Sequence, residues 1–192
     1  MKKVILIAGF SASGKDTLAR ALSEMGHHSI VSSTTRPMRP GEENGIDYNF
    51  REDGEFLNMV HDREILEFRK YDTEYKGEKA VWYYGTEFDQ LVSDKINVAV
   101  VDFDGVKAFK SYKDLDVTAV FIHVEDEVRK ARCIKRGDYD EVEFTRRLKD
   151  DREKYVDPVN WDSIDFCMDG NWEPGYVLNE FIEKLKERGV NV

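Results

Sequence analysis

A glycine-bounded loop between an apolar run and a helix-like run constrains this chain more than any other feature. Residues 4–8 are continuously apolar, residues 9–17 read GFSASGKDT, and the helix-like run continues to residue 22. This order of strand, GxxxxGK loop and helix is typical of a phosphate-binding loop, or P-loop. Its backbone N–H groups and the helix N-terminus attract phosphate, and its lysine reaches the outer phosphates. The sequence therefore predicts a nucleoside triphosphate site instead of an ordinary glycine-rich turn.

The loop supplies the candidate contacts to a triphosphate. They are Gly9, Ser11, Ala12, Ser13, Gly14, Lys15, Asp16 and Thr17. Asp16 stands where serine or threonine is usual, and a hydroxyl at that place would ligate Mg²⁺ directly. We therefore expect Asp16 to change the metal arrangement and to leave the phosphate cradle intact. As oxygen-bearing side chains, Asp16 and the neighbouring Thr17 are both candidate Mg²⁺ ligands.

Length and composition are consistent with a compact soluble enzyme. The chain has 192 residues, of which 41% are hydrophobic, and a formal net charge of −10. The negative charge argues against a nucleic-acid polymer or an anionic membrane as partner. Cys133 and Cys167 fit no CxxC spacing, and the three residues before the first apolar run leave no room for a signal peptide. We therefore expect a cytoplasmic protein of one domain with small appended subdomains.

The pattern along the chain predicts an α/β fold. Apolar or extended runs suited to buried parallel strands occur at residues 4–8, 28–32, 98–101 and 119–124. Helical patterns alternate with them, at residues 105–112, 126–136, 141–155 and 176–188. Continuous apolar runs of this kind suit parallel strands that are covered on both faces. The expected architecture is a doubly wound parallel sheet with helices on both faces.

The middle of the chain breaks this alternation. Residues 34–95 are polar and aromatic, with short extended patches at 48–50, 66–71 and 80–84. We expect a small mixed α/β lobe inserted into the core domain, which would consist of residues 1–33 and 96–192.

Two arginines at the start of this lobe form a candidate anion clamp. Residues 32–50 read SSTTRPMRPGEENGIDYNF, in which Arg36 and Arg39 flank a proline-stiffened turn and Tyr48 adds a hydroxyl donor. A guanidinium group presents two parallel donors to a phosphate. The alternative is a surface turn with solvated arginines. It weakens here because a P-loop enzyme that transfers phosphate also needs a site for the acceptor.

With this segment the sequence closely resembles the guanylate kinase family, whose acceptor-site signature runs SxTTRxxRxGExxGxDYxF. The resemblance continues through residues 65–68, 83–86, 101–106 and 132–137 and through Arg147, and it weakens after about residue 155. It implies a P-loop NTPase-type parallel sheet, an inserted lobe that binds a nucleoside monophosphate, and a helical lid at about residues 132–147.

The resemblance also implies roles for individual residues. Those expected to bind GMP are Ser32, Arg36, Arg39, Tyr48, Glu67, Tyr84, Thr86 and Asp104, with Ser32, Glu67 and Thr86 reading the guanine. Arg132 and Arg136 would join the P-loop in binding ATP. The catalytic residues implied are Lys15, Arg39, Asp102, Arg136 and Arg147. Asp102 follows the apolar run at 98–101, where a carboxylate can hold a water on Mg²⁺ or orient the acceptor, so it joins Asp16 and Thr17 as a candidate metal residue.

The implied reaction is Mg²⁺-dependent transfer of the γ-phosphoryl group of ATP to GMP or dGMP. One alternative is a related P-loop kinase for another phosphorylated acceptor, such as a ribose bisphosphate or another deoxynucleotide, since the Asp16 variant of the loop occurs in such relatives. Another is a non-catalytic guanylate-kinase-like binding module. The complete signature disfavours the first alternative, and the intact Gly9, Gly14 and Lys15 disfavour the second.

Two further segments depart from the family pattern. Residues 72–82 are longer than usual and predict an extended hairpin at the edge of the lobe. Asp169 stands where the family usually has an asparagine near the donor adenine, which leaves the choice of donor base open. For Arg132, Arg136 and Arg147, the alternative to a lid is a solvated helix face paired with Glu141 and Glu143.

Overall fold

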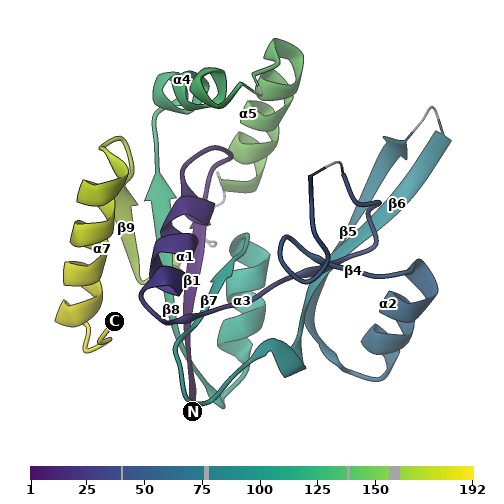
Figure 1. Cartoon of the computed structure of the whole chain (residues 1–192), viewed down its shortest axis with the longest axis horizontal. Helices are drawn as coiled ribbons and strands as arrows, with labels where there is room; N and C mark the ends of the chain where they lie inside the picture. The colour runs from purple at the N-terminus through teal and green to yellow at the C-terminus, as the bar shows by residue number, and fades with distance from the viewer. Residues whose placement is uncertain (40, 76–77, 138, 156–160) are drawn as a thin grey trace. The chain divides into compact units, whose positions relative to one another are not determined.

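The computed structural model describes residues 1–39, 41–75, 78–137, 139–155 and 161–192. The chain forms two compact units (Figure 1). Unit 1 consists of Met1–Ser29 and Asp94–Val192, and unit 2 consists of Ile30–Ser93.

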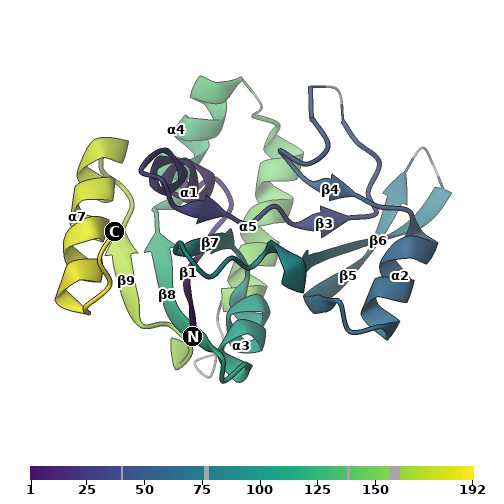
Figure 2. The ribbon, with the colours of Figure 1, turned by 60° about the horizontal axis from the view of Figure 1, so that its bottom comes forward.

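A five-stranded parallel sheet forms the centre of unit 1 (Figure 2). Its order is β2 (His28–Ser29), β7 (Asn97–Val100), β1 (Lys2–Gly9), β8 (Leu115–His123) and β9 (Phe166–Asp169). Strand β1 is central, and its Leu6 lies opposite Ala99 on one side and Ala119 on the other. Strand β1 is paired on both sides and covered on both faces, and its residues from Val4 to Ala8 are accordingly buried and apolar in both directions.

Helices cover both faces of this sheet. On one face, Ile5 and Ile122 pack with Leu22 of α1 (Lys15–Glu24) and Phe181 of α7 (Pro174–Glu187). On the other face, the Phe121 ring lies 5.6 Å from the Phe103 ring of α3 (Phe103–Ser111). Successive residues of a strand point to opposite faces, so β8 contributes to both cores. The α/β architecture predicted from the sequence is confirmed.

The helix boundaries follow local signals. Helices α4 (Asp126–Arg136) and α5 (Glu141–Tyr155) have the predicted bounds. Helices α3 and α7 begin two residues earlier than predicted. The Asp102 side chain accepts the Gly105 N–H and caps α3, and Pro174 occupies the first turn of α7, a position that suits proline. Among all residues that the structure describes, no helix is both long enough and apolar enough to cross a membrane.

Unit 2 is a mixed sheet with one α-helix in its described residues. The strand order is β4 (Asn49–Phe50), β3 (Ser33–Thr34), β6 (Glu78–Glu87) and β5 (Ile65–Tyr75). Strands β3 and β4 are parallel, whereas β6 is antiparallel to both of its neighbours. Helix α2 (Asp53–His61), which was not predicted, buries Phe56 beneath this sheet's aromatic side chains, and a short 3₁₀ turn, η1 (Phe88–Gln90), follows β6.

The predicted long hairpin is present. Strands β5 and β6 pair without interruption from Glu67 opposite Thr86 to Tyr75 opposite Glu78. Part of the predicted segment, residues 76–77, lies outside the described residues.

Candidate active site

The P-loop connects β1 to α1, and its two glycines are required by its geometry. A Cβ atom on Gly9 would lie 2.6 Å from the Ile122 carbonyl oxygen, so a side chain there would displace the β8 backbone. Gly14 has a φ angle of 94° at the N-cap of α1, a conformation that glycine adopts without strain. A side chain at either glycine would therefore strain the loop.

Lys15 is held by the loop itself. Its Nζ donates to the Phe10 carbonyl oxygen at 2.7 Å. Burial lowers the pKa of Lys15 below its ordinary value, and the nearby Asp16 and Asp151 carboxylates partly oppose that change. The lysine therefore reaches across its own loop and is fixed by a neutral acceptor.

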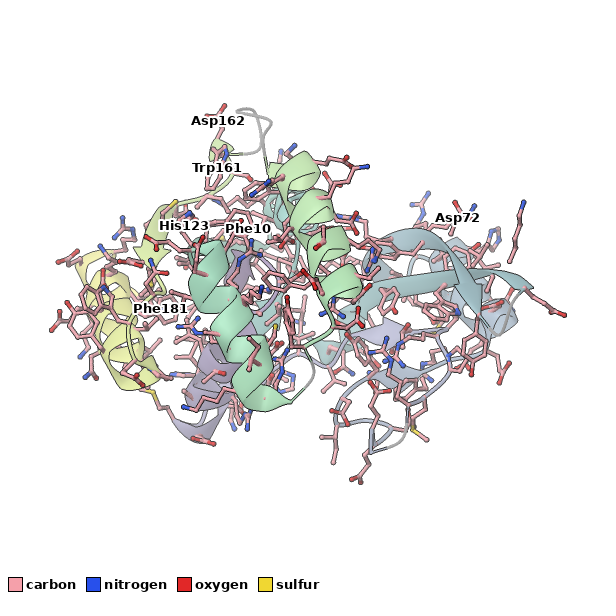
Figure 3. The ribbon with its side chains drawn as sticks, turned by 90° about the horizontal axis from the view of Figure 1, so that it is seen from above. Phe10, Asp72, His123, Trp161, Asp162 and Phe181 are labelled. Carbon is pink, nitrogen blue, oxygen red and sulfur yellow. The ribbon has the colours of Figure 1, made fainter. Side chains whose placement is uncertain are left out.

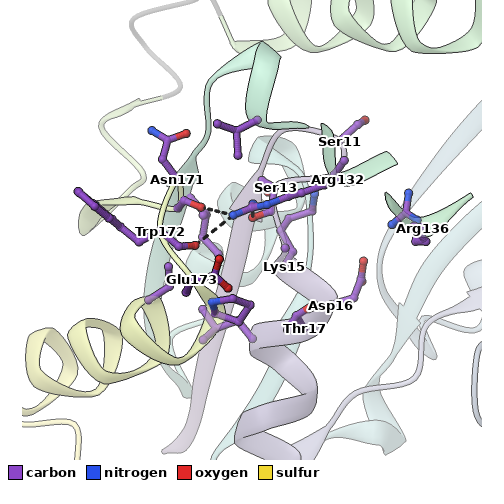
Figure 4. Close-up of a pocket in the computed structure, with 18 of the residues that line it drawn as sticks. Ser11, Ser13, Lys15, Asp16, Thr17, Arg132, Arg136, Asn171, Trp172 and Glu173 are labelled. Carbon is purple, nitrogen blue, oxygen red and sulfur yellow. Dashed lines mark hydrogen bonds between the residues drawn. The ribbon is translucent and has the colours of Figure 1, made fainter. Parts of the chain in front are cut away.

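A cavity of about 720 Å³ opens beside the P-loop (Figure 4). Residues 11–17 line it together with Arg132 and Arg136 of α4, Arg147 of α5 and residues 170–174. Its volume lies in the range typical of small-ligand sites. The structure thus brings seven predicted loop residues and three predicted arginines to one cavity, while Gly9 lies behind the loop at the end of β1.

Arg132 is built into the wall of this cavity. It donates to the carbonyl oxygens of Ser13 at 3.1 Å, Gly170 at 2.6 Å and Trp172 at 3.3 Å (Figure 4). Burial lowers the pKa of its guanidinium. These contacts contradict the alternative in which Arg132 belongs to a solvated helix face.

Arg136 is exposed, and Arg147 is half-buried like Arg132. Arg136 lies near its own-helix neighbour Cys133, with 3.9 Å between the Arg136 Nη2 and the Cys133 Sγ. Arg147 donates through Nε to Glu143 at 2.7 Å, which is the ion pair that the solvated-face alternative predicts. Both residues nevertheless line the cavity.

The candidate metal residues are divided between two places in unit 1. Asp16 and Thr17 are exposed on the cavity wall. Asp102 lies at the N-terminus of α3, where its Oδ1 accepts the Gly105 N–H at 2.9 Å, and it is outside the wall of this cavity. Asp104 lies one residue into the same helix.

In unit 2 the structure brings Arg36, Tyr48 and Tyr84 together. The Arg36 guanidinium is 5.5 Å from the Tyr48 ring centre, and the Tyr48 and Tyr84 rings are 5.9 Å apart. Arg36 is buried and donates to Glu42 at 2.7 Å and to the Pro37 carbonyl oxygen at 2.7 Å. Burial would lower the Arg36 pKa, but the hydrogen bond to Glu42 and the nearby Tyr84 raise it overall.

Arg39 has a different environment from Arg36. Its side chain is exposed, while its backbone N–H donates to Glu42 Oε2 at 2.8 Å. The hydrogen bonds from Arg36 and Arg39 lower the Glu42 pKa. One carboxylate therefore connects both predicted arginines. Pro40, which belongs to the same signature, lies outside the described residues.

The predicted base-reading residues lie on paired strands. Glu67 and Thr86 are opposite each other on β5 and β6, and the Thr86 hydroxyl donates to Glu67 Oε1 at 2.9 Å. The Arg69 guanidinium lies 3.6 Å from Glu67 Oε2. Ser32 precedes β3, where its carbonyl oxygen accepts the Asn49 N–H.

The sequence reasoning missed Arg129 and Asp151, which contact the P-loop directly. Both lie in helical segments rich in charged residues, and such residues usually face solvent. Their contacts join residues that are 22, 118 and 140 positions apart, a separation at which sequence spacing gives no signal.

Comparison with known proteins agrees with the predicted resemblance. The family model described as guanylate kinase matches residues 1–172. A guanylate kinase of Helicobacter hepaticus is 33% identical over 150 residues, which cover 73% of this chain and 71% of that protein. Guanylate kinase 2, chloroplastic/mitochondrial, of Oryza sativa subsp. japonica is 30% identical over 202 residues, with coverages of 98% and 68%.

Solved structures show that the fold is shared. The guanylate kinase of Anaplasma phagocytophilum aligns over 97% of this chain and 86% of that chain, with a TM-score of 0.64 and 24% identity. A gluconokinase of Sinorhizobium meliloti 1021 aligns over 97% and 93%, with a TM-score of 0.54 and 15% identity. The predicted P-loop NTPase-type fold is therefore confirmed. The sequence relatives support the guanylate kinase prediction over its two alternatives, and this chain belongs to the guanylate kinase family.

Proposed function

We propose that this chain transfers the γ-phosphoryl group of ATP to GMP or dGMP and releases ADP with GDP or dGDP. The observation that carries the proposal is the cavity at the P-loop, which gathers Lys15, Arg132 and Arg136 around a phosphate cradle in a member of the guanylate kinase family. Phosphoryl transfer needs little covalent help from a protein, so positioning and positive charge supply most of the catalysis.

On the donor side, the P-loop N–H groups and Lys15 bind the triphosphate. Arg132, Arg136 and Arg147 offset the repulsion between the two anionic substrates. We assign residues 132–147 to a lid that closes over the donor and excludes water, which would otherwise hydrolyse ATP. Asp138, within this lid, lies outside the described residues.

On the acceptor side, residues 34–95 act as the lobe that binds GMP. Arg36, Arg39, Tyr48 and Tyr84 bind its phosphate. Since Arg36 is paired with Glu42 in the structure, a bound phosphate replaces the Glu42 carboxylate as its partner. The Arg39 side chain is exposed, so its guanidinium is accessible to a phosphate, which suits its proposed catalytic role.

Glu67 reads the base. Guanine presents two adjacent donors, N1–H and the 2-amino group, and one carboxylate accepts both in parallel. The hydrogen bond from Thr86 holds the Glu67 carboxylate in place, and Ser32 completes the set. Adenine has an acceptor at N1 and no 2-amino group, so it offers this carboxylate neither donor and sets a lone pair against its charge.

The residues near the P-loop fit a Mg²⁺ ion. Across the described part of the chain, no group of three or more His, Cys, Asp or Glu side chains could hold a metal unaided. Mg²⁺ is usually bound by one or two carboxylates together with substrate phosphates and waters. Asp16 and Thr17 on the cavity wall would hold it, with Asp102 binding one of its waters or orienting the acceptor. When bound, the ion neutralises charge on the phosphate oxygens.

Two substitutions test this metal assignment. Asp16→Ala is expected to raise the Mg²⁺ concentration that gives half-maximal activity, because one hard oxygen ligand is lost. If the Mg²⁺ dependence is unchanged in Asp16→Ala and shifts in Thr17→Ala, the hydroxyl is the ligand and the assignment of Asp16 is wrong.

We also propose the cytoplasm as the compartment. Cys133 and Cys167 are both free thiols in the structure, which suits a reducing environment.

The experiment that tests the proposed function is a coupled assay of ADP formation with a panel of acceptors. GMP and dGMP should be consumed, and the kcat/KM for GMP should exceed that for AMP by about 10⁴-fold. Equal use of AMP or of a ribose bisphosphate would overturn the guanine assignment. GMP binding without any turnover would identify a non-catalytic binding module.

A further inference from the structure

Arg129 on α4 is the largest of the fully buried side chains. Its Nη1 donates to Asp151 Oδ2 at 2.6 Å and its Nη2 donates to Asp126 Oδ1 at 2.5 Å. Its guanidinium carbon lies 4.7 Å from the ring centre of Phe10, which is labelled in Figure 3. A buried charge is costly unless it is paired, so these contacts fix where the guanidinium can lie.

Arg129 and Asp151 hold the P-loop residue Ser11 by both of its backbone groups. Asp151 Oδ2 accepts the Ser11 N–H at 3.0 Å, and its Oδ1 accepts the Ser11 hydroxyl at 3.4 Å. Arg129 Nη1 donates to the Ser11 carbonyl oxygen at 3.3 Å. The preceding residue, Phe10, provides the carbonyl oxygen that binds Lys15. The pair therefore fixes the segment of loop against which the lysine is placed.

We propose that Arg129 and Asp151 are positioning residues, which hold the P-loop, before nucleotide binds, in the conformation that receives the triphosphate. They act through Ser11 and Phe10, and they join α4 and α5 to the loop. The inference rests on the proposed function in one respect, namely that the cavity binds the phosphates of a nucleotide.

This role predicts a specific kinetic pattern. If only a fraction of the loops is competent, the apparent dissociation constant of the nucleotide rises in inverse proportion to that fraction. A nucleotide that has bound rebuilds the loop around its phosphates, so the chemical step is preserved. Loss of the pair should therefore raise the KM for ATP with little change in kcat or in the KM for GMP.

The test measures ADP binding by calorimetry in three variants. In Asp151→Ala the dissociation constant should rise at least about tenfold, since both loop contacts of Asp151 are lost. Asp151→Asn keeps an acceptor for the Ser11 N–H and should lie between this variant and the parent. Arg152→Ala is the matched control, because Arg152 is an exposed residue of α5 that contacts Asp126 at 2.9 Å and should leave ADP binding unchanged.

The outcomes separate this inference from the proposed function. Normal ADP affinity in Asp151→Ala, with only a lower melting temperature, would show a merely structural cross-link and overturn the inference. ADP binding needs no acceptor, so it remains informative even if GMP proves not to be the substrate. If Asp151→Ala does not fold, Arg129→Met/Asp151→Leu replaces the buried pair with apolar side chains. It should fold and still bind ADP at least about tenfold more weakly, and normal affinity there would also overturn the inference.

Discussion

Two cations of the P-loop cavity, Lys15 and Arg132, are held differently from two arginines of the lobe. Lys15 and Arg132 donate to backbone carbonyl oxygens, which are neutral. In the lobe, Arg36 and Arg51 donate to the carboxylates of Glu42 and Glu87 at 2.7 Å and 3.0 Å. A carbonyl oxygen accepts a hydrogen bond from a cation without neutralising its charge. A carboxylate accepts the hydrogen bond and also neutralises the charge.

The difference also appears in the direction of the pKa changes. Burial lowers the pKa of Lys15 and of Arg132, as expected for a cation without a dominant anionic partner. In Arg36 burial acts the same way, but the hydrogen bond to Glu42 and the nearby Tyr84 raise the pKa overall. Lys15 and Arg132 therefore present positive charge to a triphosphate without first losing a carboxylate partner. In the lobe, Arg36 must exchange the Glu42 carboxylate for the phosphate of the ligand.

The largest expected effect concerns Lys15, which donates to a neutral carbonyl oxygen. Lys15→Ala should lower kcat by about 10³-fold, because Lys15 acts mainly on charge that develops in the transition state. Steady-state kinetics with both nucleotides varied measures this, and circular dichroism checks the fold. Lys149→Ala, an exposed substitution on α5, serves as the control. Near-normal turnover in Lys15→Ala would remove the basis for treating the cavity as the donor site.

The second effect concerns Glu67, the carboxylate of the lobe that accepts the Thr86 hydroxyl. Glu67→Gln should reduce the GMP-over-AMP ratio of kcat/KM from about 10⁴ to below about 10², because the amide can rotate and donate to adenine N1. Competition assays with the two monophosphates measure the ratio. Glu64→Gln, an exposed change just before β5, should leave it unaltered. An unchanged ratio in Glu67→Gln would move base recognition elsewhere.

The third effect tests whether the lobe exchanges one anion for another. Glu42→Gln should lower the free energy of unfolding by about 1–2 kcal/mol, because the buried Arg36 loses its counter-ion. Added GMP should then raise the melting temperature more in this variant than in the parent, since its phosphate supplies the missing charge. The neighbouring exposed change Glu43→Gln should alter neither quantity. Equal shifts with GMP would contradict the exchange.

The smallest effect concerns Glu143, the carboxylate that is paired with the cavity arginine Arg147. The hydrogen bonds from Arg146 and then Arg147 lower the pKa of Glu143 from 4.5 to about 2, against the opposing effect of burial. Because the pKa of Glu143 is lower in the folded chain, its ion pairs stabilise the fold fully above about pH 4.5. This stabilisation is lost as the pH falls toward 2.

Glu143→Gln should therefore cost a few tenths of a kcal/mol at pH 7, as is usual for exposed pairs within a helix. Chemical denaturation at pH 7 and pH 3 should show the difference between parent and variant shrinking at the lower pH. A pH-independent difference would mean that the side chain stabilises α5 by packing and not by charge.

The elements predicted correctly are those whose signals are local. Helices α4 and α5 have their predicted bounds, and the central strands are continuous apolar runs. Helix α2 and strand β9 were missed for different reasons. Only Phe56 of α2 is buried, so its apolar period is weak, and β9 is four residues long and acquires its strand character by pairing with β8.

The sequence by itself determined the P-loop, the α/β class of the fold and the family. Each depends on residues that are neighbours in the chain, such as Gly9 to Lys15 or the run at residues 32–50. The long-range partners of the charges beside the P-loop were decided by the tertiary structure alone. Arg129 finds Asp151 across 22 residues, and Asp151 finds Ser11 across 140, because helix packing brings their side chains to one place. Helical spacing rules extend over about four residues, so no local pattern distinguishes these buried ions from the solvated charges beside them.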